Sequence, residues 1–124
     1  MSSIESNIQK WSVKWFAYQY PNLRPNLFAV PNGAKRGRWE QGVKKGEGLT
    51  AGVADMLLLV PSEKHHGLCI EFKHEKTATS AKTYQSKEQK AWQLAVESQG
   101  YRYEVVRSFD EFKTLIEEYL GSRI

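Results

Sequence analysis

Three residues of the chain could together do metal-assisted chemistry on a phosphodiester: Asp55, Glu71 and Lys73. Only Phe72 separates Glu71 from Lys73 in an apolar stretch typical of a strand, so their side chains share one face while Phe72 points to the other. Asp55 opens the preceding apolar run, residues 56–60, and can lie at a strand end beside them. Carboxylate oxygens are ligands that Mg²⁺ and Mn²⁺ prefer, and a fixed lysine can assist the nucleophile or the developing charge. An isolated Glu-x-Lys pair is more often a solvated surface pair, so this interpretation depends on the rest of the chain.

Composition and charge place these residues in an ordinary globular domain. With 124 residues, 40% of them hydrophobic and 26% charged, the chain can close one core, and we expect a single domain over residues 1–124. The formal net charge of +4 suggests a polyanionic partner. No apolar run approaches the ~20 residues of a membrane helix and the N-terminus lacks a signal pattern, so we expect an intracellular, cytoplasmic protein without membrane contact.

The cysteine and the histidines do not predict a thiol or zinc site. Cys69 is the single cysteine and lies in an apolar strand, so we interpret it as a reduced core residue. His65, His66 and His74 do not repeat at a ligand spacing, and we interpret them as bystanders rather than zinc ligands.

The apolar periodicity predicts helices and strands in alternation. Ile4, Ile8, Trp11 and Trp15 recur at helical spacing, which predicts an amphipathic helix over 3–19 with these aromatics on its apolar face. Strands are predicted at 26–30, 53–60, 68–73 and 101–107, and further helices at 86–99 and from Ser108 onward, each opened by a Ser-x-x-Gln or Ser-x-x-Glu capping box. Because a helix joins the last two strands, these strands are expected to be parallel, in an α/β sandwich.

A long segment between the first two strands, residues 33–52, differs in composition from the rest. It holds six glycines, two glutamates and five cationic residues: Lys35, Arg36, Arg38, Lys44 and Lys45. A loop of this length is uncommon inside a compact domain and points to function or disorder. It is either a solvated surface insert or a contact for phosphates, and Trp39 within it could stack on an unpaired base.

Four segments, taken together and in order, resemble the VRR-NUC (virus-type replication-repair nuclease) family of the PD-(D/E)XK nucleases: residues 48–58, 71–73, 86–92 and 100–106. The resemblance implies a restriction-endonuclease-like core with a central mixed sheet flanked by helices. The family usually has proline before its aspartate, where this chain has Ala54, and we expect little effect on chemistry. Small stand-alone members resemble phage-borne enzymes, which implies a homodimer of the kind formed by Holliday-junction resolvases.

The resemblance also implies residue roles. Asp55 and Glu71 match the paired metal carboxylates, and the carbonyl of Phe72 is expected to add a ligand to Mg²⁺ or Mn²⁺. Lys73 matches the catalytic lysine, which orients or deprotonates the attacking water and stabilises charge at the phosphate. Gln89 matches a glutamine that arranges the metal site or the lysine.

Two of the matched residues have a structural alternative. Gln89 is also the reciprocal member of the Ser86 capping box, and both roles can hold together. Glu5 matches the acidic residue that the family places on its first helix near the metal, but Ser2-x-x-Glu5 is also a capping box. Gln9, one turn further on, is a lesser candidate for the same cleft.

The sequence therefore predicts a divalent-metal-dependent DNA endonuclease, structure-selective on branched DNA such as four-way junctions and acting as a homodimer. The first helix is a candidate dimer contact, because Phe16 and Tyr18 extend beyond its apolar stripe, although both could be core residues. In the nuclease interpretation the basic residues of 33–52 contact phosphates without reading bases. The alternatives are a non-catalytic nucleic-acid-binding module of the same fold, and a flap or single-strand nuclease.

Overall fold

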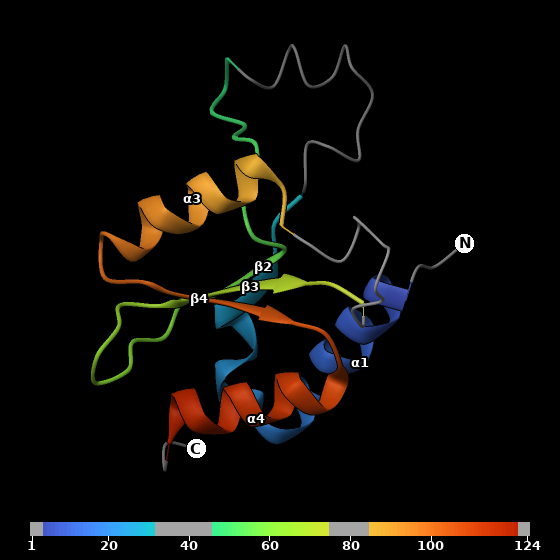
Figure 1. Cartoon of the computed structure of the whole chain (residues 1–124). Coiled ribbons are helices and arrows are strands. Elements are labelled where there is room, and N and C mark those ends of the chain that lie inside the picture. The colour runs from blue at the N-terminus through green and yellow to red at the C-terminus, as the bar shows by residue number, and fades with distance from the viewer. Residues whose placement is uncertain (1–3, 32–45, 75–84, 122–124) are drawn as a thin grey trace.

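A four-stranded mixed sheet lies between helices in the computed structural model, which describes residues 4–31, 46–74 and 85–121 (Figure 1). Helix α3 covers one face of the sheet, and α1 and α4 lie together on the other. In chain order the elements are α1 (Ile4–Gln19), the 3-10 helix η1 (Pro21–Asn26), β1 (Leu27–Ala29), β2 (Met56–Leu58), β3 (Leu68–Phe72), α3 (Lys87–Glu97), β4 (Arg102–Val106) and α4 (Phe109–Leu120). The predicted α/β class, with a mixed sheet flanked by helices, is confirmed.

The sheet has the strand order β1-β2-β3-β4, with antiparallel pairing except between β3 and β4. The parallel pairing of these two strands, predicted from the helix that joins them, is confirmed, and its register sets Glu71 beside Val105. Strand β3 is buried at every position because it has a neighbour on each side and a helical layer on each face. A strand in this position is expected to be apolar throughout, which makes Glu71 within it an exception.

Both helices that flank β4 begin at the predicted serine caps. Ser86 and Gln89 form a complete capping box at the start of α3. At α4, the Ser108 hydroxyl accepts from the backbone N–H of Glu111, but the Glu111 carboxylate accepts from Arg107 N–H instead of closing the box. Gly100 follows α3 with a φ of +91°, and a Cβ there would collide with the His66 ring, so the turn requires glycine.

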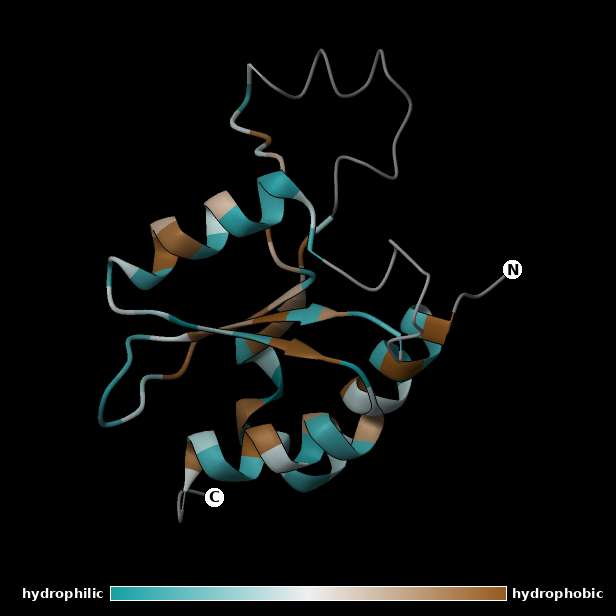
Figure 2. Ribbon diagram, viewed as in Figure 1, coloured by the Kyte–Doolittle hydropathy of each residue, from teal (hydrophilic) through white to brown (hydrophobic). Residues whose placement is uncertain are grey.

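The main core fills the space between the sheet and helices α1 and α4, and Figure 2 shows hydrophobic residues along the strands between the helical layers. Phe72 of β3 stacks on Phe112 of α4 with ring centroids 6.0 Å apart. Trp15 packs edge-on against Phe112 and Phe109, which confirms its structural role. Trp92 likewise packs on Tyr103 beneath α3.

The predicted apolar stripe of α1 is partly wrong. Trp11 is 56% exposed, and the row that enters the core is Ile8, Ser12 and Phe16, one residue around the helix from the expected row. The buried face of α1 is thus rotated relative to the predicted one. This follows from packing, because the fully buried ring of Phe16 lies against Tyr20 under the sheet. Phe16 is therefore core and no candidate for a dimer contact, whereas Tyr18 is 83% exposed.

Element boundaries also differ from prediction in two places. The segment between the prolines, expected as a loop, is the 3-10 helix η1, which Pro21 at its start favours. The strand expected over 53–60 is confined to β2, because its ladder partners in β1 and β3 pair with only Met56–Leu58. Among the described residues, no helix is both long and apolar enough to cross a membrane.

Candidate active site

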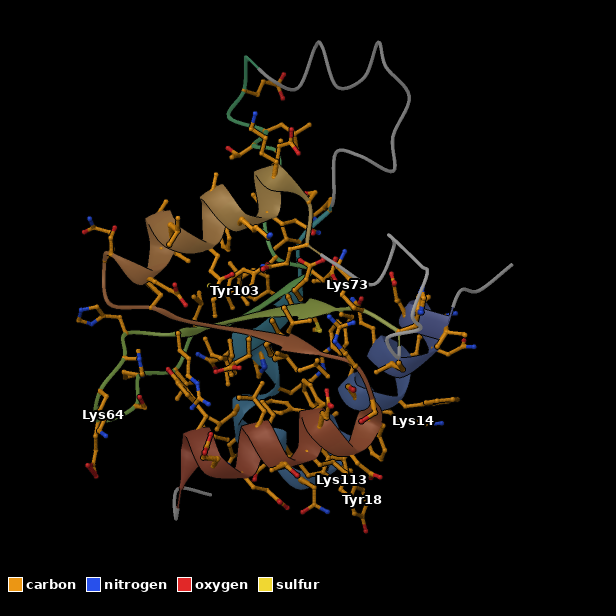
Figure 3. All side chains as sticks on the ribbon, in the orientation of Figure 1. Lys14, Tyr18, Lys64, Lys73, Tyr103 and Lys113 are labelled. Atoms are coloured by element: carbon orange, nitrogen blue, oxygen red, sulfur yellow. The ribbon has the colours of Figure 1, made fainter. Side chains whose placement is uncertain are left out.

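The alternation of β3 carries Glu71 to the face of the sheet opposite the main core. Phe72 and Ile70 enter the apolar layer under α1 and α4, and Glu71 lies on the opposite face, as predicted; this face, which Cys69 shares, is covered by α3. The Glu71 side chain is 3% exposed, and Lys73, one residue past the end of β3, holds its Nζ 3.9 Å from Glu71 Oε2. Figure 3 shows Lys73 at the end of β3 that lies nearest α1.

Asp55 lies at the start of β2, beside the end of β3. Its Oδ2 accepts a hydrogen bond of 2.8 Å from the backbone N–H of Phe72. The N–H and C=O of one strand residue point to the same side, so the Phe72 carbonyl is directed toward Asp55 as well. The backbone N–H of the next residue, Lys73, donates instead to the carbonyl of Val106 in β4, on the other side of β3. The structure thus brings Asp55 and Glu71 together, with the backbone of Phe72 between them.

Gln89 connects the cap of α3 to the buried carboxylate. Its Oε1 accepts from the backbone N–H of Ser86 at 2.8 Å, so its amide nitrogen is directed away from the cap. That nitrogen donates to Glu71 Oε2 at 2.8 Å. Gln89 therefore closes the capping box, as predicted, and also contacts Glu71, while its role in arranging the metal site stays a prediction.

A glycine allows the segment before Asp55 to approach this same turn of α3. Gly52 has a φ of +84°, and a Cβ there would overlap the backbone carbonyl of Glu88 and approach the backbone N of Gln89 to 2.8 Å. Any side chain would push the two backbones apart. Gly52 therefore holds the chain that leads to Asp55 against the turn that carries Gln89.

The two carboxyl groups destabilise each other's charge. Burial, the negative charge of Asp55, a hydrogen bond between the two carboxyls and a weaker effect of Glu5 raise the pKa of Glu71 to about 8, against the lowering effect of Lys73. In the metal-free protein a proton therefore remains between the carboxylates at neutral pH. Cation binding would replace that proton, because a divalent charge compensates both carboxylates at once.

The residues present fit a hard divalent cation. Asp55, Glu71 and the Phe72 carbonyl offer only oxygen ligands, and Mg²⁺ commonly uses few protein ligands and completes its shell with water or substrate phosphate. A larger cluster is not formed: within residues 4–31, 46–74 and 85–121, no group of three or more His, Cys, Asp and Glu side chains is arranged to hold a metal ion.

Glu5 lies at the edge of this site and is engaged elsewhere. Its Oε2 is 3.4 Å from the backbone N of His74, which donates to it, and 3.8 Å from His74 Nε2. Arg107 donates to the carbonyl of the same His74 at 3.1 Å. Glu5 still affects the charge of Glu71, so it is near the carboxylate pair without joining it. The alternative role of Glu5 in a capping box depends on Ser2, which lies outside the described residues.

Two neighbours of the site were missed from the sequence. Tyr103 OH lies 3.5 Å from Glu71 Oε1, and burial and the charge of Glu71 raise the pKa of Tyr103, so the phenol stays a donor. Alternation from Val105, the register partner of Glu71, could have placed it on this face. His74, interpreted from the sequence only as a residue that is not a zinc ligand, contacts Glu5 at the edge of the site. The predicted DNA contacts all lie outside the described residues: Lys35, Arg36, Arg38, Lys44 and Lys45. Trp39 lies outside them as well.

Comparison with known proteins agrees with this geometry. The family model of the VRR-NUC domain matches residues 3–110 of the chain. A solved structure described as a VRR_NUC domain protein matches with a TM-score of 0.78 and 23% identity, covering 97% of this chain and 90% of that chain, which shows the shared fold. A search of the curated proteins found no match. Because the family model covers most of its length, the chain belongs to the VRR-NUC family and is a nuclease of the PD-(D/E)XK type.

Proposed function

We propose that the chain is a divalent-metal-dependent DNA endonuclease whose catalytic residues are Asp55, Glu71, Lys73 and Gln89. The observation that carries the proposal is the burial of Glu71 at 3% exposure, next to a second carboxylate and 3.9 Å from a lysine. Burying a carboxylate costs stability, and a module that only binds nucleic acid has no use for that cost. The family match, which implies DNA as the substrate class, supports the same conclusion.

Asp55, Glu71 and the carbonyl of Phe72 hold Mg²⁺ or Mn²⁺ in this proposal. The cation, when bound, supplies Lewis-acid activation of the phosphate and of the attacking water. Gln89 keeps Glu71 oriented, since its amide is fixed at both ends by hydrogen bonds of 2.8 Å. Glu5 lies to one side of the carboxylate pair. It adds negative charge near the metal site but does not act as a direct ligand in the geometry described.

Lys73 is the residue that acts on the reacting groups. Its side chain is 13% exposed and its Nζ lies beside Glu71, so the ammonium is held at the mouth of the site rather than free in solvent. From there it orients the attacking water and stabilises the negative charge that builds on the phosphate. Because a lysine at this position is a point charge, its contribution falls steeply with displacement.

The substrate we propose is branched DNA, such as a four-way junction, cut by a homodimer. A four-way junction presents two symmetry-related strands, and a two-fold dimer places one site on each. A protein of 124 residues has little surface with which to span such a substrate alone. The cationic residues of 33–52 add phosphate contacts that position DNA without reading its sequence.

A cleavage panel tests both levels of this proposal. Labelled four-way junctions, flaps, splayed arms and duplexes are incubated with Mg²⁺, Mn²⁺ or excess EDTA, with Asp55→Asn as the matched inactive control. We expect paired, symmetric nicks in junctions with either cation, none in EDTA, and a dimer by light scattering. A monomer that cuts flaps better than junctions would contradict the branched-DNA proposal alone. If no DNA is cleaved with either cation, the nuclease proposal fails and the non-catalytic nucleic-acid-binding module is the interpretation that remains.

A further inference from the structure

A groove next to Asp55 runs along α1, on the side of that helix away from α4. Its volume is about 480 Å³, and it is lined by Asp55 and by residues of α1: Glu5, Ser6, Gln9, Lys10, Val13 and Lys14. None of these six α1 residues faces the centre of the core, which is entered by the row Ile8–Ser12–Phe16. The groove is therefore a surface feature that reaches the carboxylate pair at Asp55.

The α1 wall of this groove has two parallel rows of side chains. Gln9 and Val13 form one row, and Lys10 and Lys14 the other, and each pair is separated by one helical turn of about 6 Å. Val13 is half-buried and packs against the core, so it forms an apolar floor. Lys10 and Lys14 are exposed and edge the groove with two positive charges.

The charge of the molecule is distributed so that a polyanion would approach this side. Helix α4, on the same face of the sheet as α1, carries one lysine, Lys113, against four carboxylates: Asp110, Glu111, Glu117 and Glu118. Helix α1 carries two lysines against one carboxylate, Glu5. The carboxylates of α4 repel phosphates, whereas Lys10 and Lys14 balance Glu5 and Asp55 in the groove and make the end of the groove away from these carboxylates cationic.

We infer that this groove binds the sugar–phosphate backbone of the strand being cut, with Lys10 and Lys14 paired to the two phosphates next to the scissile one. Two cations one turn apart, leading away from the carboxylate pair, match a chain of negative charges that ends at the reacting phosphate. Gln9, in the neighbouring row, adds an amide donor to the same groove. The inference rests on the proposed nuclease function and names the contact that positions its substrate; phosphate contacts of this kind carry no base specificity.

The test compares the double variant Lys10→Ala/Lys14→Ala with a matched control, Lys64→Ala/Lys113→Ala, which removes the same charge outside the groove. Figure 3 shows Lys64 at the end of the molecule opposite Lys73, and Lys113 on α4. Affinity for labelled single-stranded and duplex DNA is measured by fluorescence anisotropy in EDTA, over a series of salt concentrations. Binding without turnover keeps this test independent of whether the proposed cleavage occurs. Circular dichroism melting checks that both variants are folded.

We expect the groove variant to bind at least about tenfold more weakly and its log–log salt slope to fall by ~0.9 for each lost contact to duplex DNA. The control should lose less affinity than the groove variant. A second measurement replaces the two phosphates next to the cleavage position by neutral methylphosphonates. This change should weaken binding of the wild type but not of the groove variant. Equal affinities and slopes for the two double variants, or an equal methylphosphonate effect on both, would overturn the inference.

Discussion

The two faces of the sheet differ in what they bury. Toward α1 and α4, the strands bury apolar side chains against aromatic rings from both helices, and among the described strands charged residues appear on this face only in β4, where Arg102 pairs with Glu104 and with Glu118 of α4. Toward α3 the core is smaller, with Cys69 and Tyr103 among its members, and it ends at the buried carboxylate of Glu71 with its amide donor Gln89. Figure 2 shows the same change along β3, which is hydrophobic over most of its length and hydrophilic near its C-terminal end.

This difference indicates how a small domain can carry a destabilising site. Apolar burial stabilises by about 25 cal/mol per Å², so the α1/α4 face can offset the cost of the carboxylate pair on the other face. The alternation of β3 makes the separation possible, because adjacent residues of one strand serve opposite faces. Substitutions on the face toward α3 should therefore change cleavage, whereas substitutions on the α1/α4 face should change stability without changing cleavage.

The largest effect is expected for Glu71→Gln. Loss of one metal-binding charge should lower the cleavage rate by about 10³-fold or more. In EDTA the same substitution should raise the free energy of unfolding by ~1 kcal/mol or more at neutral pH, because the wild type must take up a proton on folding to keep Glu71 neutral beside Asp55, whereas the amide is neutral in both states. Urea melts and single-turnover cleavage measure the two quantities, with the exposed Glu63→Gln as the control that should change neither. A less stable Glu71→Gln variant would contradict the account of this face.

The pH dependence of stability sharpens the same comparison. The pKa of Glu71 is about 8 in the folded protein, above its ordinary value. Between these two pKa values the folded state holds a proton that the unfolded state has released, so this contribution to stability is lost as pH rises toward 8. In EDTA, the melting temperature of Glu71→Gln should therefore exceed that of the wild type by a margin that grows between about pH 5 and about pH 8 and levels off above that. A constant margin would show that Glu71 does not titrate in this range.

Lys73→Ala should lose most turnover while keeping the metal. Removal of a positioned charge of this kind typically costs ~10²–10³-fold in rate. Calorimetric titration with Mn²⁺ should still show binding, because the carboxylate pair is intact. If the rate falls by less than about tenfold on the scale of such effects, Lys73 does not act on the reacting groups.

Substitutions at Gln89 and Ser86 distinguish the role of Gln89 in the active site from its role in the helix cap. Gln89→Ala removes the 2.8 Å hydrogen bond to Glu71 together with half of the capping box, whereas Ser86→Ala removes only the other half. Both should lower stability by ~1 kcal/mol, and only Gln89→Ala should slow cleavage, by about tenfold. Equal cleavage rates for the two variants would assign Gln89 to the cap alone.

The smallest effect concerns the apolar face. Within the described residues, Ser12 Oγ is the buried side-chain oxygen or nitrogen left without a hydrogen-bond partner, and it faces the α1/α4 core at 0% exposure. Ser12→Ala should raise the free energy of unfolding by up to ~1 kcal/mol, since the lost hydroxyl had no partner and alanine favours the helix. Cleavage should not change. A destabilised Ser12→Ala variant would reveal a role for this hydroxyl.

Local signals in the sequence were sufficient for much of this structure. Ser86 and Gly100 delimit α3, and the helix between β3 and β4 correctly indicated parallel strands. The pairing of Glu71 with Asp55 followed from strand alternation and the family motif. These features depend on residues that are close in sequence or on a short topological step.

The features that sequence missed depend on tertiary packing. Trp11 and Phe16 lie on adjacent rows of α1, and only contact with the sheet determines which row is buried. The contact between Glu5 and His74 joins residues 69 positions apart, and the Tyr103 hydroxyl approaches Glu71 across 32 positions. No local pattern encodes such distances, although the strand register, once known, places Tyr103 on the correct face.

The most direct test of the central claim is the rate of DNA cleavage as Mn²⁺ is titrated into the wild type and Glu71→Gln, at a pH where both are folded. Saturable activation of the wild type, no cleavage in EDTA, and an inactive but at least equally stable Glu71→Gln variant would support a metal site built on the buried carboxylate pair. Full wild-type activity in excess EDTA, or equal rates for the two proteins, would contradict it.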